Sequence, residues 1–208
     1  MNRKAVYKVT LDREELFGLL VCVIFFLSGG IVGTFSARSL DEAGTLALQL
    51  SMAGYIGQIT EGMTIAPGFW STLWVTGRDH LLVLFLGFSL LGALCLPLVA
   101  AVKGFYLSFS IAVFIRAFGT GGWPVAFALF GLGALITIPC FFILASQAFA
   151  TSSNLGKTAL GAGKLQAGTL YDRRYTTRIG FSALGILGAV LLELYLTPAL
   201  VVWTSSFL

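Results

Sequence analysis

The chain has 208 residues, of which 57% are hydrophobic and only 11% are charged, and its formal net charge is +4. Soluble domains carry about 25% charged residues, so this composition excludes a water-soluble globule. It predicts an all-α fold, a polytopic membrane helix bundle that forms a single domain over residues 1–208. The positive charge then indicates membrane topology rather than nucleic-acid binding.

Residues 1–15 mix charged and apolar side chains, and they predict a cytoplasmic tail. The apolar run that follows, residues 16–37, is long enough to cross a bilayer, which takes roughly 20 residues. It is longer than the core of a signal peptide, and no clean Ala-x-Ala cleavage site follows it. We therefore expect an uncleaved signal anchor.

Residues 38–80 predict an extracytoplasmic segment that contains an outer amphipathic helix. Ser39 and Glu42 have the spacing of a capping box at its start. Apolar residues then recur at helical spacing. Four of them form a candidate partner-docking face: Leu48, Met52, Tyr55 and Ile59. Two other interpretations stay open: the helix lies on the membrane surface with its apolar face down, or it packs on the bundle.

The remaining apolar runs predict four further spans, for about five transmembrane helices in all: residues 81–102, 105–118, 125–150 and 179–203. Lys103-Gly104 would make a very tight turn between the first two, and "GTGGWP" a loop before the third. Residues 151–178, the longest polar stretch, predict a cytoplasmic loop.

The basic residues set the orientation of these five spans. Ten of the thirteen lysines and arginines fall on one side when the N-terminus is cytoplasmic, and only Arg38, Arg78 and Arg116 fall outside. Basic residues concentrate on the cytoplasmic side of membrane proteins, and tryptophans concentrate at the interfaces. The four tryptophans all fall at the outer interface in this arrangement. We expect a multi-pass protein of the bacterial cell membrane with an extracytoplasmic C-terminus.

No motif in the sequence predicts catalysis or a cofactor. "GKT" at residues 156–158 lacks the first glycine of a phosphate-binding loop, since Thr151 stands there. Asp79-His80 is more simply explained by a helix start that favours an acidic residue. Three isolated cysteines, Cys22, Cys95 and Cys140, fall within apolar runs, so we expect packed thiols without disulfides or metal. Gly29 and Gly33 form a G-x-x-x-G step, which predicts close helix packing.

Glu193 is a candidate buried structural charge in an otherwise apolar run, "VLLELYLTPALVVW". A carboxylate there would be expensive if it faced lipid. We expect it to turn into the bundle and to approach Arg116, which lies near the same outer level, or a local hydroxyl such as that of Thr197. The alternative role is a transport carboxylate.

The order of "LVAAVKGFYLSFSIAVFIRAFG", "PVAFALFGLGALITIPCFFILA" and "LLELYLTPALV" along the chain resembles the stage II sporulation protein M family. That resemblance implies an integral membrane protein of endospore-forming bacteria that acts in engulfment. It implies stage II sporulation proteins D and P as partners, which cut septal peptidoglycan while protein M positions them. The sequence thus favours a non-enzymatic membrane scaffold, with membrane lipid as its surroundings. A permease-like subunit of a transporter is the alternative.

Overall fold

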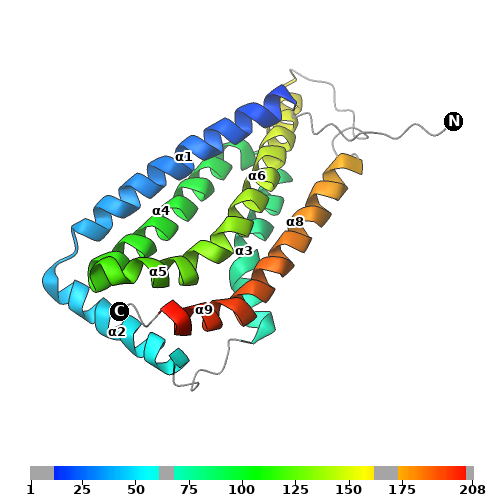
Figure 1. Cartoon of the computed structure of the whole chain (residues 1–208). Coiled ribbons are helices and arrows are strands. Elements are labelled where there is room, and N and C mark those ends of the chain that lie inside the picture. The colour runs from blue at the N-terminus through cyan, green and yellow to red at the C-terminus, as the bar shows by residue number, and fades with distance from the viewer. Residues whose placement is uncertain (1–11, 61–67, 162–172, 205–208) are drawn as a thin grey trace.

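The computed structural model describes residues 12–60, 68–161 and 173–204, and every regular element in these ranges is helical. In chain order they are α1 (Arg13–Arg38), α2 (Glu42–Thr60), α3 (Phe69–Gly87), α4 (Gly92–Phe118), the short η1 (Gly119–Gly121), α5 (Gly122–Ala126), the π-helical turn η2 (Phe127–Gly131), α6 (Leu132–Ala159), α8 (Arg173–Leu191), the π-helical turn η3 (Leu192–Leu196) and α9 (Thr197–Thr204). The long helices α1, α3, α4, α6 and α8 lie side by side and alternate in direction (Figure 1).

Three stretches are long and apolar enough to cross a membrane: Arg13–Arg38, Gly92–Ala159 and Tyr175–Thr204. The second contains both α4 and α6, which run in opposite directions in Figure 1. The predicted all-α bundle with membrane-length helices is therefore confirmed at this level. The exterior is apolar, as the exposed fractions of Phe85 (74%) and Leu94 (73%) illustrate.

The predicted hairpin between residues 81–102 and 105–118 is wrong. The chain turns at residues 88–91, and α4 continues without a break through Lys103 and Gly104. Ser152 of α6 hydrogen-bonds to the backbone of this turn. Its hydroxyl donates to the Ser89 carbonyl at 2.6 Å and accepts from the Ala93 N–H at 2.7 Å. The second long helix therefore starts at Phe69, inside the segment predicted to lie outside the membrane.

Other predicted boundaries shift less. Helix α6 runs on to Ala159 and so includes the start of the predicted 151–178 loop, while α8, η3 and α9 together cover the predicted 179–203 span. The π-turn η3 has a local cause. Pro198 has no N–H and its ring would crowd a carbonyl one turn back, so the helix widens before it. The Thr197 N–H accordingly bonds to the Leu192 carbonyl, five residues earlier.

Helices α1 and α4 touch backbone to backbone through glycines. A β-carbon on Gly29 would collide with the Ala101 backbone, one on Gly33 with the Phe105 backbone, and one on Gly104 with the Phe26 backbone. Close approach of this kind is a common use of small residues in membrane helix pairs. The packing role predicted for Gly29 and Gly33 is confirmed, and Gly104 belongs to the same contact instead of a turn.

All four tryptophans lie at the end of the bundle crossed by α2, which we call the tryptophan end (Figure 1). They are Trp70 and Trp74 in the first turns of α3, Trp123 in α5 and Trp203 in α9, and each is between 61% and 78% exposed. At the opposite end, Arg178 of α8 binds Glu15 of α1 at 2.6 Å, and this pair fastens α8 to α1.

Candidate functional site

The hairpin at residues 88–91 brings three charged side chains together halfway along the bundle. Lys103 Nζ of α4 lies 2.8 Å from Asp79 Oδ2 of α3, and Arg78 Nε lies 3.7 Å from Asp79 Oδ1. The Lys103 side chain is 17% exposed, that of Asp79 37% and that of Arg78 64%. We call Arg78, Asp79 and Lys103 the central charged cluster. Asp79 was predicted at a helix start, and that prediction is wrong.

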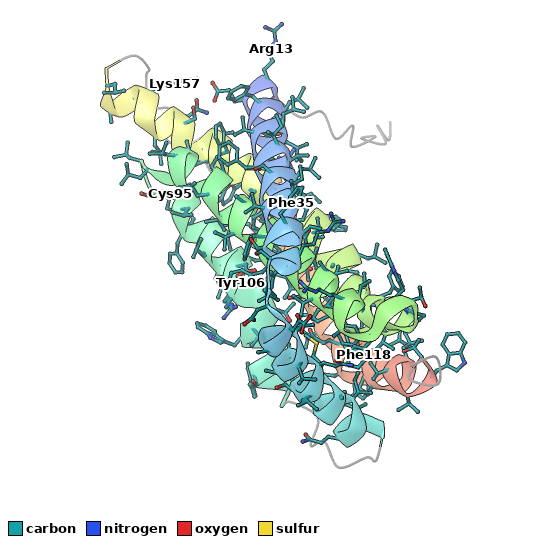
Figure 2. The ribbon with its side chains drawn as sticks, turned by 90° about the vertical axis from the view of Figure 1, so that its left-hand side faces the viewer. Arg13, Phe35, Cys95, Tyr106, Phe118 and Lys157 are labelled. Carbon is teal, nitrogen blue, oxygen red and sulfur yellow. The ribbon has the colours of Figure 1, made fainter. Side chains whose placement is uncertain are left out.

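The cluster lies far from both ends of its helices. At 1.5 Å per residue, Lys103 is about 16 Å along α4 from Gly92 and about 22 Å from Phe118. Figure 2 shows Tyr106, one turn beyond Lys103, between Cys95 and Phe118 along α4. A charged side chain at the centre of a bilayer costs about 2.5–3.5 kcal/mol on insertion scales, so such residues are rare and mark functional or pairing sites.

An open groove of about 650 Å³, the central groove, runs along the cluster between α3, α4 and α6. Its polar lining comes from the cluster and from Tyr106, Ser110 and Thr137. The rest of the lining is apolar. Four residues of the groove are exposed on the flank of the bundle: Leu82, Leu98, Val102 and Tyr106. The groove therefore combines charge with an apolar rim.

His80 joins α3 to α6 behind the cluster and is 1% exposed. Its Nε2 lies 3.2 Å from the Thr137 carbonyl oxygen, and its Nδ1 lies 3.3 Å from the Thr76 carbonyl oxygen. The ring of Phe141 stands edge-on to the imidazole and also lies beneath Lys103 Nζ, 5.3 Å from the ring centroid. His80 thus links α3 to α6 in the interior of the bundle.

Glu193 lies in η3, and its carboxylate is bound by a hydroxyl from another helix. Thr76 Oγ1 of α3 donates to Glu193 Oε2 at 3.0 Å. The predicted partners do not reach it: Arg116 binds elsewhere, and the Thr197 hydroxyl donates to the Leu192 carbonyl at 3.4 Å. Glu193 is exposed in a second groove of about 390 Å³, the end groove, and Phe130 lines both this groove and the central one.

Arg116, predicted as the partner of Glu193, instead clamps the junction between α1 and α2. Its Nη1 donates to the Ala37 carbonyl at 2.9 Å and to the Arg38 carbonyl at 2.7 Å, and its Nη2 donates to the Leu40 carbonyl at 2.9 Å. The last carbonyls of a helix lack partners within it, and a cation there also complements the helix dipole. Free acceptors at the end of α1 explain why Arg116 binds there.

The predicted docking face of α2 is covered by the bundle. Leu48, Met52 and Ile59 are half-buried, and Ile56 between them is 6% exposed. Met52, Ile56 and Ile59 pack against a cluster formed by Phe114, Phe118, Val125, Ala126 and Val201. The side chain of Tyr55 lies outside the described residues. Of the interpretations left open for this helix, the contacts of Met52, Ile56 and Ile59 agree with packing on the bundle.

The outward face of α2 carries different apolar residues, Leu46 (56% exposed) and Leu50 (66% exposed). Sequence periodicity alone missed them, because apolar residues occur on both faces of this helix. No group of three or more metal-ligating side chains occurs among residues 12–60, 68–161 and 173–204, and within the same ranges Cys22, Cys95 and Cys140 are free thiols.

The fold and the cluster define a class: an all-helical bundle with membrane-length apolar helices and charged side chains at mid-length. Comparisons of the chain with protein-family models, with curated proteins and with solved structures give no match.

Proposed function

We propose that this protein is a non-enzymatic, multi-pass membrane scaffold that presents α2 as a rigid platform outside the cytoplasm. In this proposal α1, α3, α4, α6 and the α8–α9 unit cross the membrane, so the N-terminus is cytoplasmic and the C-terminus is extracytoplasmic. The exposed tryptophans at the tryptophan end support an interface there, and basic residues such as Arg13 and Lys157 at the other end support the cytoplasmic side.

The Arg116 clamp is the observation that carries the proposal. Three hydrogen bonds from one guanidinium tie the end of α4 to the α1–α2 junction, and the apolar stripe of α2 packs on the bundle. A helix fixed in this way loses little conformational entropy when a partner binds its outward face. Leu46 and Leu50 on that face supply the apolar contact. The resemblance to the sporulation family suggests stage II sporulation proteins D and P as those partners.

The test compares recruitment of these two hydrolases by variants of the full chain in sporulating membranes. Leu50→Arg should abolish co-purification, because the substitution changes only the outward face. Arg116→Leu should reduce it as well, because α2 is released from the junction. Arg38→Leu is the matched control, since the Arg38 side chain lies over the Phe35 ring and its backbone carbonyl, which Arg116 uses, is retained.

Each variant must insert into the membrane at wild-type abundance for the comparison to count. Recruitment that survives both Leu50→Arg and Arg116→Leu would contradict the platform. A photo-crosslinking residue at position 46 then serves as a direct readout, because it should capture a hydrolase while one at the inward position 52 should not.

A permease-like function is the second candidate, and the central charged cluster favours it. Ionisable residues at mid-membrane often line ion or substrate paths. In this case Asp79→Asn, assayed in proteoliposomes, should remove a solute or proton flux that the wild-type protein supports. Wild-type vesicles without any flux would leave the scaffold as the function.

A further inference from the structure

Two arginines meet at the tryptophan end without an acidic partner. Arg38 is the last residue of α1, and Arg116 lies in the last turn of α4, two residues before its end at Phe118. Within the described residues, no carboxylate oxygen lies within 4.0 Å of either guanidinium. Two positive charges therefore stand at this end of the bundle without an anion from the described part of the chain.

The two arginines line one groove of about 500 Å³ between α1 and α4, which lie side by side (Figure 1). Trp123, which is 61% exposed, lines the same groove. The groove reaches from Arg116 to Ser108, eight residues or about 12 Å along α4. Its other lining residues are small or apolar apart from the hydroxyl of Thr34: Thr34, Ala37, Ile111, Ala112 and Ile115. The groove is therefore charged at the tryptophan end and largely apolar further in.

Both guanidinium groups keep hydrogen-bond donors that a ligand can use. A guanidinium carries five N–H donors. Arg116 makes three hydrogen bonds to carbonyls of the α1–α2 junction, so at least two donors remain, and those carbonyls carry no net charge. The Arg38 side chain lies over the Phe35 ring, with Cζ 5.9 Å from the ring centroid, and no described residue accepts a hydrogen bond from it.

The acidic residues that follow Arg38 in the chain serve α2 and do not line the groove. Asp41 Oδ1 accepts from the Gly44 N–H at 2.9 Å, and Glu42 lies in the first turn of α2. Acidic groups at these positions complement the positive end of a helix. The positive charge of the groove is therefore left for a ligand from outside the chain.

We propose that this groove binds an anionic glycerophospholipid. Its phosphate lies on Arg38 and Arg116, and the first part of an acyl chain follows α4 toward Ser108. Arginine binds phosphate through paired, charge-assisted hydrogen bonds. A net negative head group is preferred to a zwitterionic one, because the cationic part of the latter would add positive charge to a site with two arginines.

The depth of the groove agrees with this ligand. Lipid head groups lie just outside the hydrocarbon core, and tryptophans concentrate at the same interface. Trp123 and both arginines lie at one end of the bundle, where a lipid phosphate is available. The site rests on the membrane placement proposed above, but it is independent of what α2 recruits.

The test measures lipid selectivity at Trp123 by fluorescence quenching in the full chain. Trp70→Phe, Trp74→Phe and Trp203→Phe together leave Trp123 as the only tryptophan. The protein is reconstituted in equal mixtures of phosphatidylglycerol and phosphatidylcholine, with bromine near the carboxyl end of the acyl chains of one lipid at a time. Brominated phosphatidylglycerol should quench Trp123 more strongly than brominated phosphatidylcholine, which gives the relative affinity for the anionic lipid.

A protein that keeps only Trp74 is the matched control. Trp74 is 65% exposed at the same end of the bundle, and the groove that it lines contains no lysine or arginine. The two brominated lipids should therefore quench it equally, as expected for lipid that surrounds the protein without a preferred site.

Substitution of Arg38 decides whether the selectivity arises in this groove. Arg38→Gln should lower the relative affinity for phosphatidylglycerol about fivefold, since a basic residue near the membrane surface contributes about 1 kcal/mol. Arg38→Lys keeps the charge and should retain most of the selectivity. Arg116→Gln should act in the same direction as Arg38→Gln, but Arg116 also holds the α1–α2 junction, so the decision rests on Arg38.

Three results would overturn the proposal. They are equal quenching of Trp123 by the two lipids, a folded Arg38→Gln protein with wild-type selectivity, and loss of selectivity on addition of inorganic phosphate at constant ionic strength. The last result would assign the groove to a soluble ion. Quenching of neither Trp123 nor Trp74 would refute the membrane placement together with the site, so the two failures are distinguishable.

Discussion

Within the central charged cluster, substitution of Asp79 should destabilise the protein more than substitution of Lys103. Lys103→Met leaves Asp79 beside Arg78, 3.7 Å away, so the carboxylate keeps a cation and the cost should be about 1 kcal/mol. Asp79→Leu leaves two cations with no anion between them. Removing one partner of a buried pair costs about 3–5 kcal/mol, and the 37% exposure of Asp79 favours the lower end of that range. The two substitutions should therefore differ by about 2 kcal/mol.

The free energy of unfolding can be measured by titrating the protein with SDS in mixed micelles and following helical circular dichroism. The double variant, Asp79→Leu with Lys103→Met, should be more stable than Asp79→Leu alone, because one unpaired cation has been removed; the cycle gives the coupling directly. Lys157→Met is the control. Its pair with Glu14 is about half exposed, and the change should stay within about 0.5 kcal/mol. A Lys103→Met protein as unstable as Asp79→Leu would refute the role assigned to Arg78.

Three further substitutions test the packing and the hairpin. Gly104→Ala should destabilise the fold by about 1–3 kcal/mol, because its methyl group meets the backbone of α1, whereas Gly180→Ala, with open space around it, should be neutral in the same titration; equal effects would contradict the glycine contact. Ser152→Ala should cost about 1–3 kcal/mol, since it leaves turn backbone groups without a partner, and an unchanged unfolding midpoint would show that the cap is dispensable. In cysteine-free protein, an impermeant thiol reagent should label Leu90→Cys from the N-terminal side and should not label Lys103→Cys; the reverse pattern would restore the turn expected from sequence.

The hairpin shows what hydropathy can and cannot predict here. Residues 81–102 are so apolar that they predict one span, although Gly87, Ser89 and Gly92 flank or lie within the turn that the structure places at residues 88–91. Local residues contribute to the turn, since Ser89 Oγ accepts from the Leu91 N–H and a β-carbon at Gly92 would collide with the Leu86 carbonyl. Its long-range support is the hydroxyl of Ser152, about 60 residues away in the chain, which binds the turn backbone. The strongest polar signal, Lys103-Gly104, lies inside α4 because Asp79 neutralises the lysine and α1 packs on the glycine.

The sequence predicted a buried carboxylate at position 193, but the structure leaves Glu193 exposed in the end groove. A carboxylate at position 193 that binds a hydroxyl was expected, and a hydroxyl does bind it, but from Thr76 instead of the local Thr197. Arg116 was expected to need an anion, yet three carbonyl oxygens serve it. In both cases the partner belongs to another helix, so its identity depends on helix packing that periodicity and spacing do not contain.

The orientation proposed for the bundle does not depend on where the hairpin turns. Moving the turn from residues 103–104 to residues 88–91 exchanges one short connection for another, so the number of long helices between the two ends stays odd. The same correction takes Arg78 and Lys103 out of the flanking segments. Of the thirteen basic residues, two then lie mid-bundle, and Arg38 and Arg116 lie at the tryptophan end. Of the other nine, five lie in helices toward the opposite end: Arg13, Lys157, Arg173, Arg174 and Arg178. The remaining four fall outside the described residues, so the proposed orientation keeps a basic asymmetry of five to two between the ends among the described residues.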